Sequence, residues 1–122
     1  MSDTKKLVII NSRGLDDERS SVAFSIANTA SASNMDVTMF LVSAGADWAR
    51  KGAAEFAHLN PLDPTIGDMM KSFMDNGGRI LVCPPCAGVR GYEQDDLMDG
   101  VTLAGSVAML DVVQQGAEAI TF

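Results

Sequence analysis

The sequence predicts an α/β fold in which a mostly parallel five-stranded sheet carries helices on both faces, as a three-layer single domain over 1–122. Short, nearly continuous apolar runs are typical of strands that are buried on both faces. These runs alternate with longer segments of helical periodicity, an order that favours parallel strands joined by helices. A length of 122 residues with 47% hydrophobic residues is enough for one core without disulfide or metal staples.

The first half of the chain is predicted to form two strands with a helix between them. Lys6–Asn11 is an apolar run that ends in polar residues, as a buried strand does. The acidic residues at 16–18 are expected to open the first helix, because carboxylates in a first turn interact favourably with the helix dipole. The second strand is predicted at 36–42, followed by a loop at 43–46 and a short helix within 47–58.

The second half repeats the alternation of helix and strand. A helix is predicted to begin near Pro64 and to run through Met74, and the glycines at 77 and 78 end it. Arg79–Val82 is the third predicted strand, and Cys83 follows it directly. The remaining predicted elements are a strand at Val101–Leu103, a helix over 104–115 and a last strand at 119–122.

Charge and composition argue against several classes of partner. The formal net charge is −7, from 9 basic and 16 acidic residues, so non-specific binding of nucleic acid or of an anionic membrane is not expected. No apolar run approaches the length of a membrane span. The first residues lack a small-residue cleavage site and are interpreted as mature protein. With two cysteines in a chain that needs no staples, the expected location is the cytoplasm, where thiols stay reduced.

The most informative motif is ILVCPPCAGVRGY, at 80–92, which contains both cysteines of the chain. Cys83 follows a predicted strand and should lie at the carboxyl edge of the sheet, where α/β proteins usually bind ligands. A thiol before a helical turn faces free backbone N–H groups, which favour the nucleophilic thiolate. The opposing interpretation is that Cys83 merely completes an apolar strand, because small buried cysteines are common in cores. The second thiol, Cys86, and a nearby arginine favour the functional interpretation.

Residues near the cysteines in sequence or at the same sheet edge could complete a binding site. Arg90 is the nearest cation and could stabilise a thiolate or a bound anion. Gly88 would let the backbone approach a ligand closely. Asn11 and Arg13 follow the first strand and could bind an anionic group at the same edge. Strand capping and a solvated arginine explain these last two residues equally well.

A CxxC motif is also typical of thioredoxin-like dithiols and of zinc sites. Thioredoxin-type motifs follow an early strand and precede a long helix, whereas this motif lies in the last third of the chain before a short segment. A structural zinc ion usually takes four ligands, but the chain offers two cysteines and His58. The segment NSRGLDDERS has one glycine and gives no GxGxxG dinucleotide loop. Neither a metal nor another cofactor is therefore expected.

The cysteine loop with VRGY, the segment LMDGVTLAGSVAMLDVV and the terminal AEAITF resemble the DsrE/DsrF/TusD-like family, which has the YchN-like fold. The segment LVIINSRGLDDERSSVAFSIANTA is similar to the first strand and helix of that family. The resemblance covers most of the chain and implies a three-layer α/β fold that assembles as a homo-oligomer, either a trimer or a hexamer. The best understood members carry sulfur as a cysteine persulfide, between sulfur donor and acceptor proteins.

Carried over residue by residue, the resemblance implies that Cys83 holds the sulfur, because it stands eight positions before the glycine of the Arg90-Gly91 pair. Cys86 matches a second cysteine of many stand-alone members and would act as a resolving or relay thiol. The two prolines between the cysteines, and Gly88, depart from the family pattern. We expect a sulfur carrier with sulfurtransferase-like chemistry. A binding protein for a small anion or metabolite and a dithiol redox sensor are the alternatives.

Overall fold

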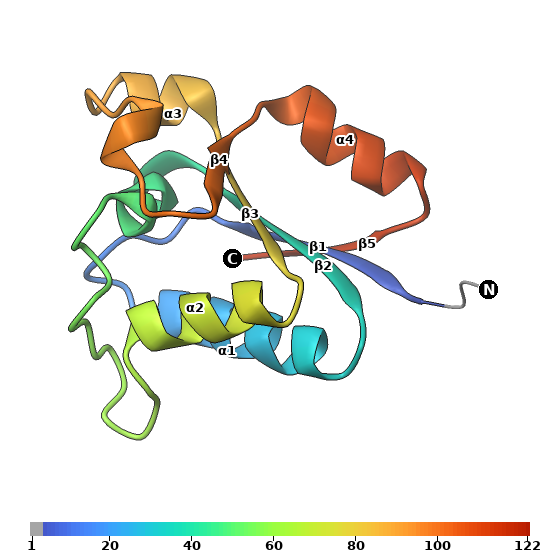
Figure 1. The fold of residues 1–122 in the computed structure, drawn as a ribbon, viewed down its shortest axis with the longest axis horizontal. Helices are drawn as coiled ribbons and strands as arrows, with labels where there is room; N and C mark the ends of the chain where they lie inside the picture. The colour runs from blue at the N-terminus through green and yellow to red at the C-terminus, as the bar shows by residue number, and fades with distance from the viewer. Residues whose placement is uncertain (1–3) are drawn as a thin grey trace.

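The computed structural model describes residues 4–122, which form a central sheet between two helical layers (Figure 1). The five strands are β1 (Lys6–Asn11), β2 (Asp36–Leu41), β3 (Arg79–Val82), β4 (Val101–Leu103) and β5 (Glu118–Thr121). All neighbouring strands are parallel, and their order across the sheet is β4-β3-β2-β1-β5. The predicted fold class is confirmed, and the sheet proves to be parallel throughout.

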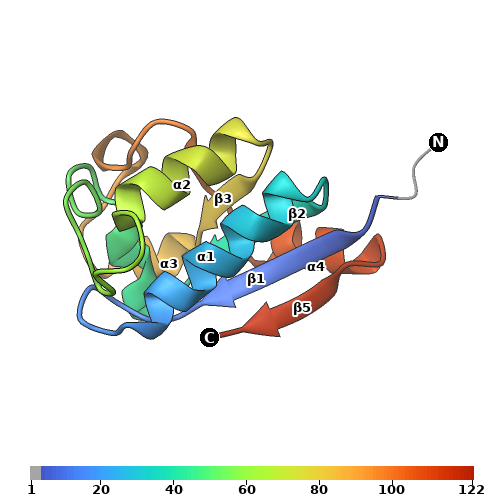
Figure 2. The same cartoon turned by 90° about the horizontal axis from the view of Figure 1, so that it is seen from below.

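The helices cover the two faces of the sheet unequally. Both α1 (Arg19–Ala32) and α2 (Ile66–Asp75) lie on one face, and α4 (Ser106–Gln114) lies on the other (Figure 2). The three short helices are η1 (Ser43–Ala49), α3 (Pro84–Gly88) and η2 (Gln94–Asp96). Among residues 4–122, none of the helices has the length and apolar character that crossing a membrane requires.

The larger core lies between the sheet and the α1–α2 layer. Ile9, Met39 and Ile80 are partners in register across three neighbouring strands, and all three side chains are buried in this core. Because side chains alternate along a strand, Val8 and Phe40 point to the opposite face, toward α4, and are also buried. Strands buried on both faces explain why the sequence shows continuous apolar runs rather than alternation.

Trp48 belongs to the core. Its indole ring is fully buried and meets Phe24 of α1 edge-on, with ring centroids 6.1 Å apart and an interplanar angle of 82°. The indole N–H donates hydrogen bonds to Ser20 Oγ at 2.9 Å and to the Arg13 carbonyl at 3.1 Å. These bonds satisfy the only polar atom of the ring, so the large side chain stabilises the junction between η1 and the start of α1.

The ends of three neighbouring strands are aligned at the carboxyl edge of the sheet. Asn11, Leu41 and Val82 are partners in register on β1, β2 and β3. Cys83 continues the ladder, because its N–H donates to the Leu41 carbonyl at 3.1 Å. The segments that follow these strands therefore emerge at one edge, as the sequence predicted.

Two expectations about helices are wrong. The first helix begins at Arg19 rather than at 16–18, because the Asp17 carboxylate accepts the backbone N–H of Arg19 at 2.9 Å and stays outside the helix. No regular helix fills 47–58; the short helix η1 instead begins at Ser43, within the predicted loop at 43–46, and ends at Ala49. After η1 the chain instead pairs with a distant segment, since Arg50 bridges Leu97 in antiparallel fashion.

Candidate functional site

The two cysteines lie at the carboxyl edge of the sheet, where β3 passes into α3. Cys83 is the residue that precedes the helix, and Cys86 lies within it. Pro84 and Pro85 occupy the first helical positions, where a missing N–H costs nothing and a fixed φ suits the helix. Both thiols are free and half-buried, so each remains within reach of a reagent or partner.

The pKa of Cys83 is raised above its usual value. Burial is the main cause, because it disfavours the charged thiolate, and the neighbouring Cys86 thiol raises the pKa further. The backbone N–H of Cys86 acts in the opposite direction but is outweighed. The sequence pattern predicted that backbone N–H groups favour the thiolate, and the Cys86 N–H acts in that sense, but burial makes the net pKa shift opposite to the expected one. At neutral pH Cys83 is a neutral thiol.

Arg90 does not face the thiols as a free cation. Its Nη1 donates to the Cys86 carbonyl at 3.0 Å, and its Nε lies 3.3 Å from Asp47 Oδ1. The same Asp47 oxygen accepts a 2.6 Å hydrogen bond from the Tyr92 hydroxyl. This bond and burial raise the pKa of Tyr92, which is therefore a neutral donor at neutral pH. Arg90 thus ties the backbone of the cysteine helix to η1.

The backbone after Cys86 closes into a tight turn. The Arg90 and Tyr92 N–H groups both donate to the Ala87 carbonyl, at 3.0 and 2.9 Å. Gly91 has a φ of +77°, a left-handed conformation that favours glycine. Gly88 is the last residue of α3. The space beside it is open, since a Cβ placed on Gly88 would meet no heavy atom within 4 Å. The backbone at Gly88 is therefore open on this side, and its expected role in ligand binding stays a prediction.

Asn11 and Arg13 lie at the same edge but are separated from the cysteines by β2. Asn11 is fully buried, and its Oδ1 accepts the Arg13 N–H at 3.0 Å, so its side chain caps the end of β1. Arg13 is half-buried, and its Nη1 lies 3.9 Å from Asp17 Oδ2. These contacts favour capping as the role of Asn11. Arg13 is not a solvated arginine, since its Nε is buried without a hydrogen-bond partner within residues 4–122, and anion binding by the two residues stays a prediction.

The residues that sequence reasoning missed are Asp47 and Tyr92. They come from η1 and from the turn after α3, and the Asp47 carboxylate contacts both Arg90 and the Tyr92 hydroxyl. The neighbouring Trp48 donates a hydrogen bond to the Arg13 carbonyl, in the loop after β1. The helix η1 therefore contacts both the loop after β1 and the turn after α3. The strand order could have indicated these two residues, because η1 follows β2 and the carboxyl end of β2 lies beside that of β3.

A hollow of about 370 Å³ opens beside the cysteine turn. It is lined by the basic residues Arg50, Lys51 and Arg90 and by the acidic residues Asp95 and Asp96. Within residues 4–122, no group of three or more histidine, cysteine or acidic side chains is placed to hold a metal ion. The chemistry available at this edge is therefore that of two neighbouring thiols next to a mixed-charge hollow.

Comparison with known proteins identifies the family. The family model of the DsrE/DsrF-like family matches residues 5–122. The chain belongs to the DsrE/DsrF-like family. Its relatives include the uncharacterized proteins MJ0760 and MJ0989 of Methanocaldococcus jannaschii, at 31% identity over 111 residues and 29% over 119 residues. The match with MJ0989 covers 97% of this chain and 99% of that protein. The match with MJ0760 covers 90% of this chain but only 40% of that protein. The chain thus spans about two fifths of the length of MJ0760.

Solved structures of similar fold agree with this assignment. The YchN protein from E. coli superposes with a TM-score of 0.78 at 20% sequence identity, covering 98% of this DsrE/DsrF-like chain and 99% of YchN. MTH1491, a protein of unknown function from Methanobacterium thermoautotrophicum, gives a TM-score of 0.74 at 18% identity. This superposition covers 98% of this chain and 100% of MTH1491. At these identities the similarity establishes the fold, which is the YchN-like fold named by the sequence resemblance.

Proposed function

We propose that this DsrE/DsrF-like protein is a sulfur carrier that holds sulfane sulfur as a persulfide on Cys83. The observation that supports the proposal most strongly is the pair of free, half-buried thiols at the start of α3. Cys86 raises the pKa of Cys83, which indicates that the two thiols interact. Family membership gives the fold and not the activity, so the proposal depends on the chemistry of these two residues.

Loading transfers one sulfur atom from a donor persulfide. The Cys83 sulfur attacks the outer, sulfane sulfur of the donor, and a new S–S bond forms as the S–S bond of the donor breaks. The donor leaves as a thiolate and takes up the proton that Cys83 loses. The Cys83 thiol thereby becomes a persulfide, and the donor persulfide becomes a thiol. No net oxidation occurs. Because burial disfavours the free thiolate, we expect deprotonation of Cys83 to take place within the donor complex.

Unloading can follow either of two routes. An acceptor thiol can attack the sulfane sulfur and regenerate Cys83. Alternatively, Cys86 attacks the Cys83 sulfur, which forms a Cys83–Cys86 disulfide and releases hydrosulfide. In that route the two thiols are oxidised by two electrons and the sulfane sulfur is reduced, so an external dithiol must later reduce the disulfide. We propose the reducing cytoplasm as the location, where such dithiols are available.

We also propose that the protein works as a homo-oligomer, either a trimer or a hexamer. Support comes from α4, an apolar helix in which every side chain except that of Val112 is at least partly exposed. Val107 is 85% exposed and Leu110 is 50% exposed on the same helix. These two side chains are three residues apart and lie on one face of α4, and an exposed apolar helix face is typical of interfaces. Light scattering should give a mass of three or six chains, and Val107→Glu with Leu110→Glu should lower it. A monomeric wild type would contradict this part of the proposal.

The test of carrier function is the mass of the reduced protein after incubation with a persulfide donor. Wild type is expected to gain one sulfur atom, and Cys83→Ser is expected to gain none. A redox sensor would instead form a reversible disulfide without gaining sulfur. A binding protein for an anion or metabolite would do neither. Either result would overturn the proposal.

A further inference from the structure

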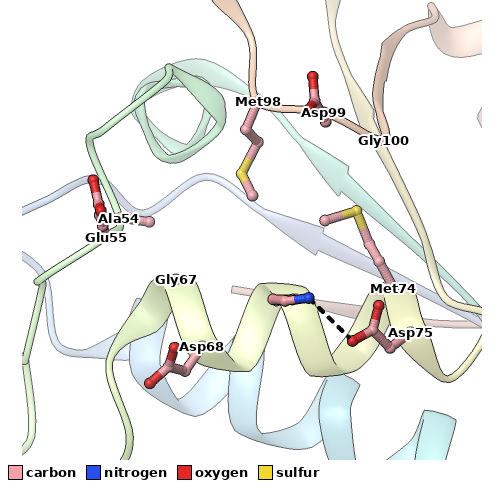
Figure 3. Close-up of a pocket in the computed structure, with 10 residues that line it drawn as sticks. Ala54, Glu55, Gly67, Asp68, Met74, Asp75, Met98, Asp99 and Gly100 are labelled. Atoms are coloured by element: carbon pink, nitrogen blue, oxygen red, sulfur yellow. Dashed lines mark ion pairs between the residues drawn. The ribbon is translucent and has the colours of Figure 1, made fainter.

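A second site lies away from the cysteines, in a groove of about 620 Å³ between α2 and two loops (Figure 3). One wall is the exposed face of α2, from Gly67 to Asp75. The second wall is the loop at 54–55, and the third is the segment 98–100 that precedes β4. The volume falls in the range of small-molecule pockets. Neither cysteine lines the groove, so its function is separate from the proposed sulfur chemistry.

The inside of the groove is apolar. The thioether side chains of Met74 and Met98 reach into it from opposite walls, and Ala54 contributes a methyl group (Figure 3). Gly67 and Gly100 let neighbouring walls approach each other closely. A Cβ at Gly67 would lie 2.9 Å from the Ala54 carbonyl oxygen, and one at Gly100 would lie 3.0 Å from the Met74 sulfur. This interior suits a methylene chain, because thioethers adapt to irregular apolar shapes.

The rim of the groove is acidic. Asp68 and Asp75 come from α2, Glu55 from the second wall and Asp99 from the third. Lys71 is the one cation among the lining residues, so the lining carries a net charge of −3 from four carboxylates and one ammonium group. A ligand that fits both the interior and the rim has an aliphatic body and more than one positive charge.

We infer that the groove binds a linear aliphatic polyamine. Asp68 and Asp75 are seven residues apart on α2, which places them two turns apart, about 10 Å along the helix axis. An extended triamine has a comparable length, so its end ammonium groups can reach both carboxylates while its methylene groups lie against Met74 and Met98. The existing ion pair between Lys71 Nζ and Asp75 Oδ2, at 3.6 Å, shows the same alkylammonium–carboxylate contact at one end. The Lys71 side chain is therefore a competitor for the ligand.

The test is titration calorimetry at low ionic strength with spermidine as the probe. Hexaamminecobalt(III) serves as the matched control, because it carries the same charge in a compact shape without methylene groups. We expect one spermidine per chain and weaker binding of the cobalt complex. Equal binding of the two cations would indicate general attraction to an acidic protein and would overturn the inference, as would absence of spermidine binding.

Substitutions at three exposed positions of α2 test whether spermidine binds in this groove. Asp68→Asn and Asp75→Asn are each expected to weaken spermidine binding about three-fold, the range of an exposed ion pair. Lys71→Met is expected to strengthen it by a similar factor, because it removes the competing ammonium group. Asp16→Asn removes one exposed carboxylate outside the groove and should leave the affinity unchanged. Equal effects of Asp16→Asn and Asp68→Asn, or weaker binding by Lys71→Met, would contradict the assignment.

Discussion

The Tyr92 hydroxyl donates a 2.6 Å hydrogen bond to Asp47 Oδ1, across 45 residues of sequence. The same carboxylate oxygen lies 3.3 Å from Arg90 Nε, and Arg90 in turn donates to the Cys86 carbonyl. The position of the cysteine helix therefore depends on a carboxylate from a different loop.

Tyr92→Phe removes the hydrogen bond to Asp47 and should lower the free energy of unfolding by about 1 kcal/mol at neutral pH. The bond to Asp47, followed by burial, raises the pKa of Tyr92 above its usual 10.0. Its stabilising contribution is therefore complete below pH 10 and is lost as the pH rises through the pKa of the folded protein. Urea unfolding of both proteins at neutral and alkaline pH measures this. Equal stability at neutral pH would show that the bond contributes nothing.

Cys86→Ala should lower the pKa of Cys83. Burial is the main cause of the raised value and largely remains, but the contribution of the Cys86 thiol is removed, and the backbone N–H of residue 86 is retained. The pH profile of Cys83 alkylation, followed by peptide mass, gives the pKa in each protein. An unchanged or higher midpoint in the variant would mean that the two thiols do not interact in solution.

The Asp17 carboxyl group should titrate with a pKa of about 2, chiefly because the Arg19 side chain hydrogen-bonds its charged form. This stabilising interaction is present above the usual value of 3.8 and is lost as the pH falls toward 2. Arg19→Gln should move the pKa part of the way back, since the backbone N–H of residue 19 still donates to Asp17. NMR titration of the Asp17 carboxyl carbon measures both values. Identical midpoints in the two proteins would contradict the role of the guanidinium.

Gly45→Ala should destabilise the carboxyl edge of the sheet by about 1–3 kcal/mol, the cost of overpacking. A Cβ at Gly45 would lie 2.2 Å from the Asn11 backbone oxygen, which cannot move without disturbing β1. Gly88→Ala is the control, because its added Cβ meets nothing within 4 Å. Urea unfolding should show a loss for the first variant and little change for the second. Equal behaviour would argue against close contact between η1 and β1.

The inner strands β1 and β2 were predictable because parallel strands buried on both faces leave apolar runs, as in Lys6–Asn11, whereas the edge strand β5 is exposed along its length. The expected helix at 47–58 failed for a tertiary reason. Its alanines have high helix propensity, but the Lys51 N–H donates to the Asp96 carbonyl at 2.9 Å, so the chain follows a distant segment instead. Local propensity alone does not reveal such a partner.

The candidate site was predicted in part. The sequence located Cys83, Cys86 and Arg90, because the motif follows a strand at the ligand-binding edge of the sheet. It did not reveal that Asp47 would hold Arg90, since sequence proximity to the thiols says nothing about a partner 43 residues away. The direction of the Cys83 pKa shift was also missed, because burial depends on packing that only the folded chain defines.

Intact-protein mass spectrometry of wild type, Cys83→Ser and Cys86→Ser after reaction with a persulfide donor tests sulfur carriage most directly. If Cys83 carries sulfur, wild type gains one sulfur atom, Cys83→Ser gains none, and Cys86→Ser keeps the adduct longer than wild type because the resolving thiol is absent. If Cys83→Ser gains the same adduct as wild type, or if no form gains sulfur, the chain does not carry sulfur on Cys83.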